Sequence, residues 1–175
     1  MKNLFKIILF ISIFIFSNEE KTLASDIYFV DYSRVMNESK AGKKAQDYLK
    51  NLLNSSNKKF NDTAKKLKEE ENKIISQKNA LSKEEYKKKA DALRKKVFEL
   101  NKEREKSIRE VAKKRKKAGD EMLKNLNPIL GKYMQENNIA VVIDKKNVLM
   151  GDKKFEITSQ IIEILNKEFK SINLN

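Results

Sequence analysis

Charged side chains are the main groups with functional chemistry in this 175-residue chain, which holds 39 Lys and Arg, 25 Asp and Glu, and neither His nor Cys. Without His and Cys, the chain lacks the commonest zinc ligands and the commonest catalytic bases and nucleophiles. Its carboxylates are scattered among lysines at surface helical spacing, whereas catalysis needs a convergent pocket. No glycine-rich phosphate loop is present. The sequence therefore predicts no enzyme, no metal site and no cofactor.

The strongest functional signal is an excess of positive charge in residues 83–117, where 16 Lys and Arg stand against seven Asp and Glu, a net charge of +9. A solvated helix face needs only balanced Glu and Lys pairs at i,i+4 spacing. An excess of nine charges repels itself, so we interpret it as attraction for acidic clients or anionic lipid headgroups. The cations assigned to this attraction are Lys87, Lys88, Arg94, Lys95, Arg109, Lys113, Arg115 and Lys117.

The run KKRKK in residues 113–117 also suggests nucleic-acid binding, because clustered cations neutralise phosphates by counterion release. No aromatic stacking platform or base-reading motif accompanies the run. We therefore expect no specific nucleic-acid partner.

These charges must be carried by long helices. Apolar positions recur at spacings of three and four through residues 42–127, with almost no helix breakers, which predicts an antiparallel helical hairpin that resembles a coiled coil. Ser82 and Glu85 form a capping box, so the tip is placed near 79–82 and the second helix begins just after it. Pro128 is expected to kink or restart that helix.

We call the hairpin of residues 42–127 the arm, and the line of apolar positions along which its two helices are expected to pack the seam. Phe98 is the apolar residue of the arm that fits the seam least well, because it lies beside the seam position Val97. We interpret Phe98 as an apolar client contact.

Both ends of the chain predict a small sheet. Residues 27–30 are a short run of strand formers, and residues 139–143 and 148–151 are predicted as a β-hairpin with a polar turn. Thr158 is predicted as the N-cap of a closing helix. The expected fold is α+β and mostly α, with a small antiparallel β body formed by both chain ends.

The body is assigned residues 26–41 and 128–175. A sheet of two or three short strands buries little apolar area and leaves edges unpaired, so we expect it to oligomerise. The apolar side chains assigned to the oligomerisation body are Ile27, Phe29, Val141, Ile143, Val148 and Met150.

Residues 1–25 differ from the polar remainder. Two lysines precede an apolar run from Ile7 to Phe16, and small residues follow it, as in a cleaved signal peptide. The apolar run is shorter than the roughly 20 residues that a membrane-spanning helix needs. We expect export to the periplasm.

Three motifs resemble those of the Skp (OmpH-like) periplasmic chaperones: IYFVD followed by SRVM in residues 27–36, AVVID in 140–144, and EIT in 156–158 ahead of Ile162 and Leu165. The resemblance covers the whole chain after residue 25. It implies a homotrimer whose helical arms surround a cavity for unfolded outer-membrane proteins, held without ATP. It also leaves anionic lipid or lipopolysaccharide as a further ligand of the arm.

A structural protein is the alternative to such a holdase chaperone. A coiled-coil scaffold of the cell envelope would share the hairpin and would bind one folded partner. The predicted strands favour the chaperone, because a spacer needs no sheet.

Overall fold

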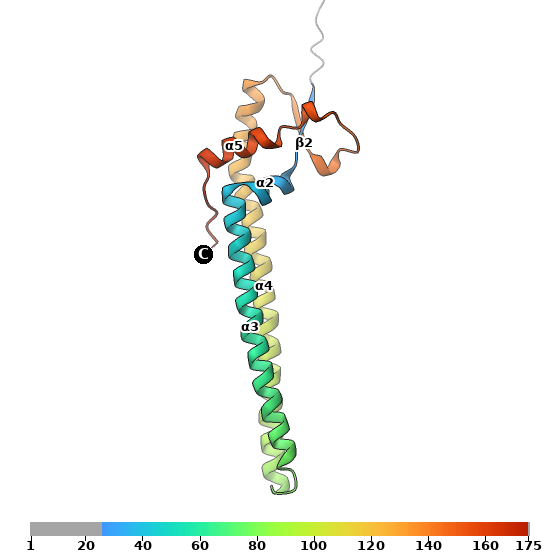
Figure 1. Ribbon diagram of the computed structural model, residues 1–175, viewed down its shortest axis with the longest axis vertical. Coiled ribbons are helices and arrows are strands. Elements are labelled where there is room, and N and C mark those ends of the chain that lie inside the picture. The colour runs from blue at the N-terminus through green and yellow to red at the C-terminus, as the bar shows by residue number, and fades with distance from the viewer. Residues whose placement is uncertain (1–25, 175) are drawn as a thin grey trace, which may run out of the picture.

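The computed structural model describes residues 26–174, so the predicted signal peptide lies outside the described residues. A long helical hairpin projects from a small body that holds both ends of the described chain (Figure 1). None of the described helices combines the length and apolar character needed to span a membrane. The elements in order are β1 (Ile27–Val30), α2 (Tyr32–Glu38), α3 (Lys40–Ser76), α4 (Lys83–Glu136), β2 (Val141–Asp144), the short 3-10 turns η1 (Lys145–Asn147) and η2 (Lys153–Phe155), and α5 (Thr158–Glu168).

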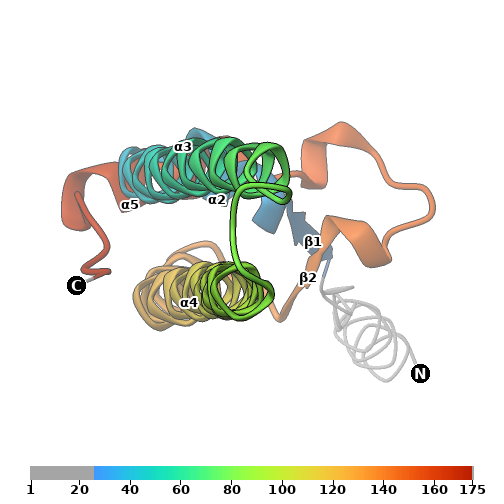
Figure 2. The same ribbon diagram turned by 90° about the horizontal axis from the view of Figure 1, so that it is seen from below.

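The hairpin helices begin at side-chain caps. The Ser39 hydroxyl accepts a hydrogen bond from the backbone of Gly42 at the start of α3. At the start of α4, Ser82 and Glu85 cap each other's backbone N–H groups, which confirms the predicted capping box. Viewed end-on in Figure 2, α3 and α4 lie side by side.

Helix α4 is 54 residues long and runs through Pro128, so the expected restart at this proline is wrong. Proline removes one intrahelical hydrogen bond. Its neighbours Leu126 and Ile129 are only 1% and 5% exposed, and their packing in the body holds the helix together across the gap.

The sheet corrects two predictions. Strands β1 and β2 are parallel, with Ile27 opposite Val141 and Phe29 opposite Ile143, so the predicted antiparallel arrangement is wrong. Parallel strands need a long crossover, and the chain from α2 to α4 supplies one. The predicted β-hairpin of residues 139–151 is also wrong, because Asp144 caps η1 and turns the chain away from β2.

Residues 148–151 therefore form no strand. The other side of β1 is occupied instead by an isolated bridge between Phe29 and Glu156, where the N–H of Ile157 donates to the carbonyl of Phe29 at 3.0 Å.

The main core lies where the body meets the base of the hairpin. Every helix contributes to it, and α5 supplies the side chains Ile161 and Leu165, both fully buried. Met122 and Leu126 of α4 also pack there, although they precede the predicted boundary at residue 128. The body and the first turns of the arm therefore share one core.

Thr158 has a different role from the one predicted. The N-cap of α5 is Ile157, which has no side-chain cap. The buried Thr158 hydroxyl accepts a hydrogen bond from Asp31 N–H at 2.9 Å and donates one to Glu156 at 3.0 Å. Its hydrogen bonds tie α5 to the end of β1, so they are not available to cap the helix.

Candidate interaction surfaces

Buried and exposed positions alternate along the seam of the hairpin. Phe60, Ile74 and Val111 are 5%, 7% and 8% exposed, whereas Leu53 and Val97 are 38% and 41% exposed. Apolar side chains cover only part of the seam because polar residues interrupt the heptad pattern. Solvent therefore reaches the seam midway along the arm.

Two hollows lie on opposite sides of this open seam, and both are lined by Leu67 and Leu100. Their volumes are about 640 and 630 Å³, respectively, for the two faces named next. We call one side the open face; it is lined among others by Ala64, Lys68, Arg94, Val97, Phe98, Asn101 and Arg104. We call the other side the paired face; it is lined among others by Lys59, Ala92, Lys95, Lys96, Glu99 and Glu103.

The paired face is crossed by contacts between the helices. Lys96 pairs with Glu70 at 2.7 Å, and Lys59 pairs with Glu103 at 3.2 Å. Further along, Lys89 donates to the Gln77 side chain at 3.3 Å. Lys89, Lys96 and Glu103 are spaced by seven residues, which places them on one side of α4. The sequence reasoning missed these pairs, although the seven-residue spacing could have indicated them.

The open face differs in its ion pairs. Lys68 pairs with Glu71 and Arg94 pairs with Asp91, each within a single helix. Arg104 has no carboxylate partner among residues 26–174; its guanidinium lies 5.7 Å from the centroid of the buried Phe60 ring. Within the described chain, no ion pair joins α3 to α4 through the residues of this face.

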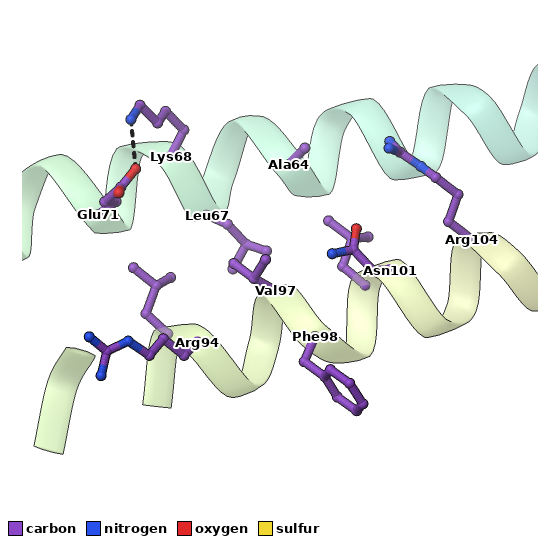
Figure 3. Close-up of a pocket in the computed structure, with 11 residues that line it drawn as sticks. Ala64, Leu67, Lys68, Glu71, Arg94, Val97, Phe98, Asn101 and Arg104 are labelled. Carbon is purple, nitrogen blue, oxygen red and sulfur yellow. Dashed lines mark hydrogen bonds and ion pairs between the residues drawn. The ribbon is translucent and has the colours of Figure 1, made fainter. Parts of the chain in front are cut away.

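Phe98 is 66% exposed at the rim of the open face. In Figure 3 its ring points away from α3, whereas Val97 points toward α3. The position beside the seam that the sequence indicated is therefore a solvent position. Whether Phe98 contacts clients stays a prediction.

The eight cations selected from the sequence do not form one site. They are distributed along α4 from Lys87 to Lys117, which is about 45 Å of helix at 1.5 Å per residue. Arg94 and Arg109 form ion pairs with neighbours on the same helix at 2.7 and 3.3 Å. Such an array favours diffuse attraction and not tight binding of one ligand.

The base of the arm holds a contact that the sequence reasoning missed. Leu174 is 5% exposed and packs against Ala45, Leu49 and Ala118, and its carbonyl accepts a hydrogen bond from the Lys114 ammonium. The segment after α5 therefore returns to the hairpin, as Figure 2 shows. The apolar residues of this tail, Phe169, Ile172 and Leu174, are too few to give a periodic signal by which to predict this contact.

The six residues assigned to the oligomerisation body divide into two groups. Phe29 is buried and Ile143 and Val148 are partly buried, whereas Ile27, Val141 and Met150 are 56%, 43% and 92% exposed. Leu149, which the prediction omitted, is 103% exposed. Large apolar side chains are therefore open to solvent both on the two-stranded sheet and on the loop of residues 148–151 that follows η1.

A polar network holds the segments of the body together. Glu156 accepts hydrogen bonds from Lys145 at 2.8 Å, Thr158 at 3.0 Å and Arg34 at 3.2 Å. The hydrogen bond from Lys145 is the main reason that the pKa of Glu156 lies below its usual value; those from Thr158 and Arg34 act in the same direction. This carboxylate therefore joins α2, η1 and α5. No group of three His, Cys, Asp or Glu residues within 26–174 is arranged to hold a metal ion.

Both the sequence and the fold are similar to those of known proteins. A family profile described as "Outer membrane protein (OmpH-like)" matches residues 26–165. The fold is similar to that of a crystal structure of an OmpH-like outer membrane chaperone from Caulobacter crescentus CB15, with a TM-score of 0.77 and 18% sequence identity. The alignment covers 84% of this chain and 87% of that chain. No relative was found among curated proteins by sequence comparison.

Proposed function

Because this chain belongs to the OmpH-like family, we propose that it is an ATP-independent holdase chaperone of the periplasm that binds unfolded outer-membrane proteins. The observation that carries the proposal is the arm itself. It projects away from the core, and midway along it the apolar side chains of Val97 and Phe98 and the charge of Arg104, which has no carboxylate partner among residues 26–174, are open to solvent. A stable monomer gains nothing from this arrangement, whereas a partner with exposed apolar groups and negative charge can use it.

Many weak contacts suit this role. The cations of α4 would attract acidic segments of an unfolded client over a distance, and Phe98 would add apolar contact at short range. Anionic lipid or lipopolysaccharide could use the same cations. Because no contact is tight, a client could rearrange while it is held and leave without ATP hydrolysis.

The proposal places the arms on a homotrimer. A second copy would cover the exposed apolar side chains of Ile27 and Val141, which are paired in the sheet, and of Leu149 and Met150 in the loop after η1. Residues 26–41 and 128–175 would then be the oligomerising body and residues 42–127 the arm. Residues 1–25 would direct export and be removed.

The test dilutes a urea-unfolded outer-membrane β-barrel protein into buffer with the purified protein and without nucleotide, and follows turbidity. Light scattering on the same samples gives the molar mass of the complex. We expect a soluble complex of one client with about three copies of the chain. An oligomer that leaves the client to aggregate would contradict the holdase proposal and favour the envelope scaffold.

The oligomer is tested separately by Met150→Asp. A charge placed in a covered apolar surface is costly, so we expect a lower molar mass by light scattering. Lys153→Asp, at an exposed position three residues further on, is the matched control and should leave the mass unchanged. An unchanged mass for Met150→Asp would remove this surface from the proposed interface.

A further inference from the structure

The two faces of the arm differ in a way that selects one of them as the binding face. On the paired face, the charges of Lys59 and Lys96 are already neutralised by Glu103 and Glu70 across the seam. A ligand there would have to displace ion pairs that join the helices. On the open face, no described ion pair joins the helices, so a ligand can enter without separating charges that hold the hairpin closed.

The open face also combines the two kinds of group that an unfolded chain could use. Phe98 and Val97 expose apolar surface, at 66% and 41%. The charged residues that line the face are Lys68, Arg94 and Arg104 against Glu71. Arg94 also pairs with Asp91 of the same helix, and with both carboxylates counted the three cations still leave one net positive charge around an apolar centre. The hollow of about 640 Å³ is of the size that holds a few side chains.

The spacing of these groups indicates the pattern of the bound chain. Arg94 and Arg104 are ten residues apart, which is about 15 Å along a helix, and Phe98 lies between them. An extended chain covers that distance in four to five residues at about 3.3 Å each. Its alternate side chains point to the same side. Two carboxylates four residues apart would thus face the two arginines, with the residue midway between them facing Phe98.

We propose that the open face binds extended, unfolded polypeptide in which an apolar residue is flanked at two residues on each side by a carboxylate. This inference rests on the proposed holdase function and specifies which side of the arm carries it and which segments of a client it holds. The paired face keeps the two helices together.

The test uses two synthetic peptides of the same composition. In the first, Tyr at the centre has Asp two residues away on each side. In the second, the Asp residues are moved next to the Tyr, so that in an extended chain they point to the opposite side from the ring. Because the protein has no cysteine, a single one can be introduced and labelled with an environment-sensitive dye, at Asn101→Cys on the open face or at Ala92→Cys on the paired face.

We expect the first peptide to change the dye emission at position 101 and not at position 92. Its half-saturation concentration should be about fivefold lower than that of the second peptide. Phe98→Ser should raise that concentration about tenfold and Arg104→Gln about threefold. Lys59→Gln removes a positive charge from the paired face, at a residue outside the cations of α4, and is the matched control, with a change below about twofold.

Equal responses at the two dye positions, or equal binding of the two peptides, would overturn the inference. The aggregation assay with an unfolded client separates this failure from that of the proposed function. If the protein keeps the client soluble but does not distinguish the faces or the peptides, the holdase function is supported and selective binding at the open face is rejected. If the client aggregates although the first peptide binds selectively at the open face, the holdase function is rejected and selective binding at the open face is supported.

Discussion

The body and the arm are built from the same chain but depend on different forces. In the body, Ile161, Leu165 and Val35 are fully buried, and a shared carboxylate joins three segments. In the arm, the seam residues Leu53 and Val97 are 38% and 41% exposed, and the contacts across the seam include exposed ion pairs. Buried apolar area contributes far more to stability than exposed ion pairs do. The body can therefore hold the arms in place while the arms stay soft enough to adapt.

The largest expected effect tests this comparison directly. Ile161→Ala empties a fully buried site in the body and should lower the free energy of unfolding by about 3 kcal/mol. Leu53→Ala in the arm, where the side chain is 38% exposed, should cost less than about 1 kcal/mol. Urea unfolding followed by circular dichroism measures both. Equal costs would mean that the arm contributes as much to stability as the body.

The next effect concerns the joint between the two regions. A Cβ added at Gly42 would lie 2.1 Å from the carbonyl oxygen of Met36, so Gly42→Ala forces α2 and α3 apart and should cost about 2 kcal/mol. Gly131→Ala in α4 is the matched control, because nothing lies within 4 Å of its added Cβ. Helix propensity predicts that it stabilises the protein, by up to about 1 kcal/mol. Thermal unfolding compares the two, and a harmless Gly42→Ala would show that this joint can shift.

A pH dependence should arise in the body from Glu156. Hydrogen bonds, first from Lys145 and then from Thr158 and Arg34, lower its pKa in the folded state. A carboxyl whose folded pKa is depressed contributes stability above its unfolded pKa of about 4.3, and that contribution is lost as the pH falls through the folded value. Unfolding measured from neutral to acidic pH should therefore show a smaller acid-dependent loss for Glu156→Gln. An identical loss would assign the acid sensitivity to other carboxylates.

The smallest effect is expected on the paired face of the arm. Lys96→Gln and Glu70→Gln, made singly and together, should give a coupling energy of about 0.5 kcal/mol that falls in high salt, because both side chains are largely exposed. The double-mutant cycle is measured by urea unfolding at low and high salt. A coupling energy above about 1.5 kcal/mol would show that this face holds the hairpin more firmly than surface charges normally do.

Local signals explain what could be predicted. The capping box of Ser82 and Glu85 acts over three residues, so its chemistry can be read without knowing the rest of the fold. The long apolar periodicity similarly predicted the two helices. The strand of residues 27–30 was predicted because a short run of strand formers is typical of a buried strand, and in the structure Phe29 and Val30 of this strand are buried.

Two of the errors depended on a partner distant in the sequence. The direction of β2 relative to β1 and the role of Thr158 are decided by segments more than 100 residues away. The missing strand of residues 148–151 has a local cause, because Asp144 caps η1 and turns the chain away from β2. Propensity at Thr158 favours an N-cap, but Asp31 offers its hydroxyl a hydrogen bond of longer range.

The sequence by itself determined the helical hairpin, its tip and the positive charge of its second helix, because periodicity, capping and composition act locally. Only the tertiary structure decided that β1 and β2 are parallel, that Leu174 packs at the base of the arm, and that ion pairs cross one face of the seam and leave the other open. These features depend on which side chains meet across the seam and the sheet, and that is set by packing between distant segments.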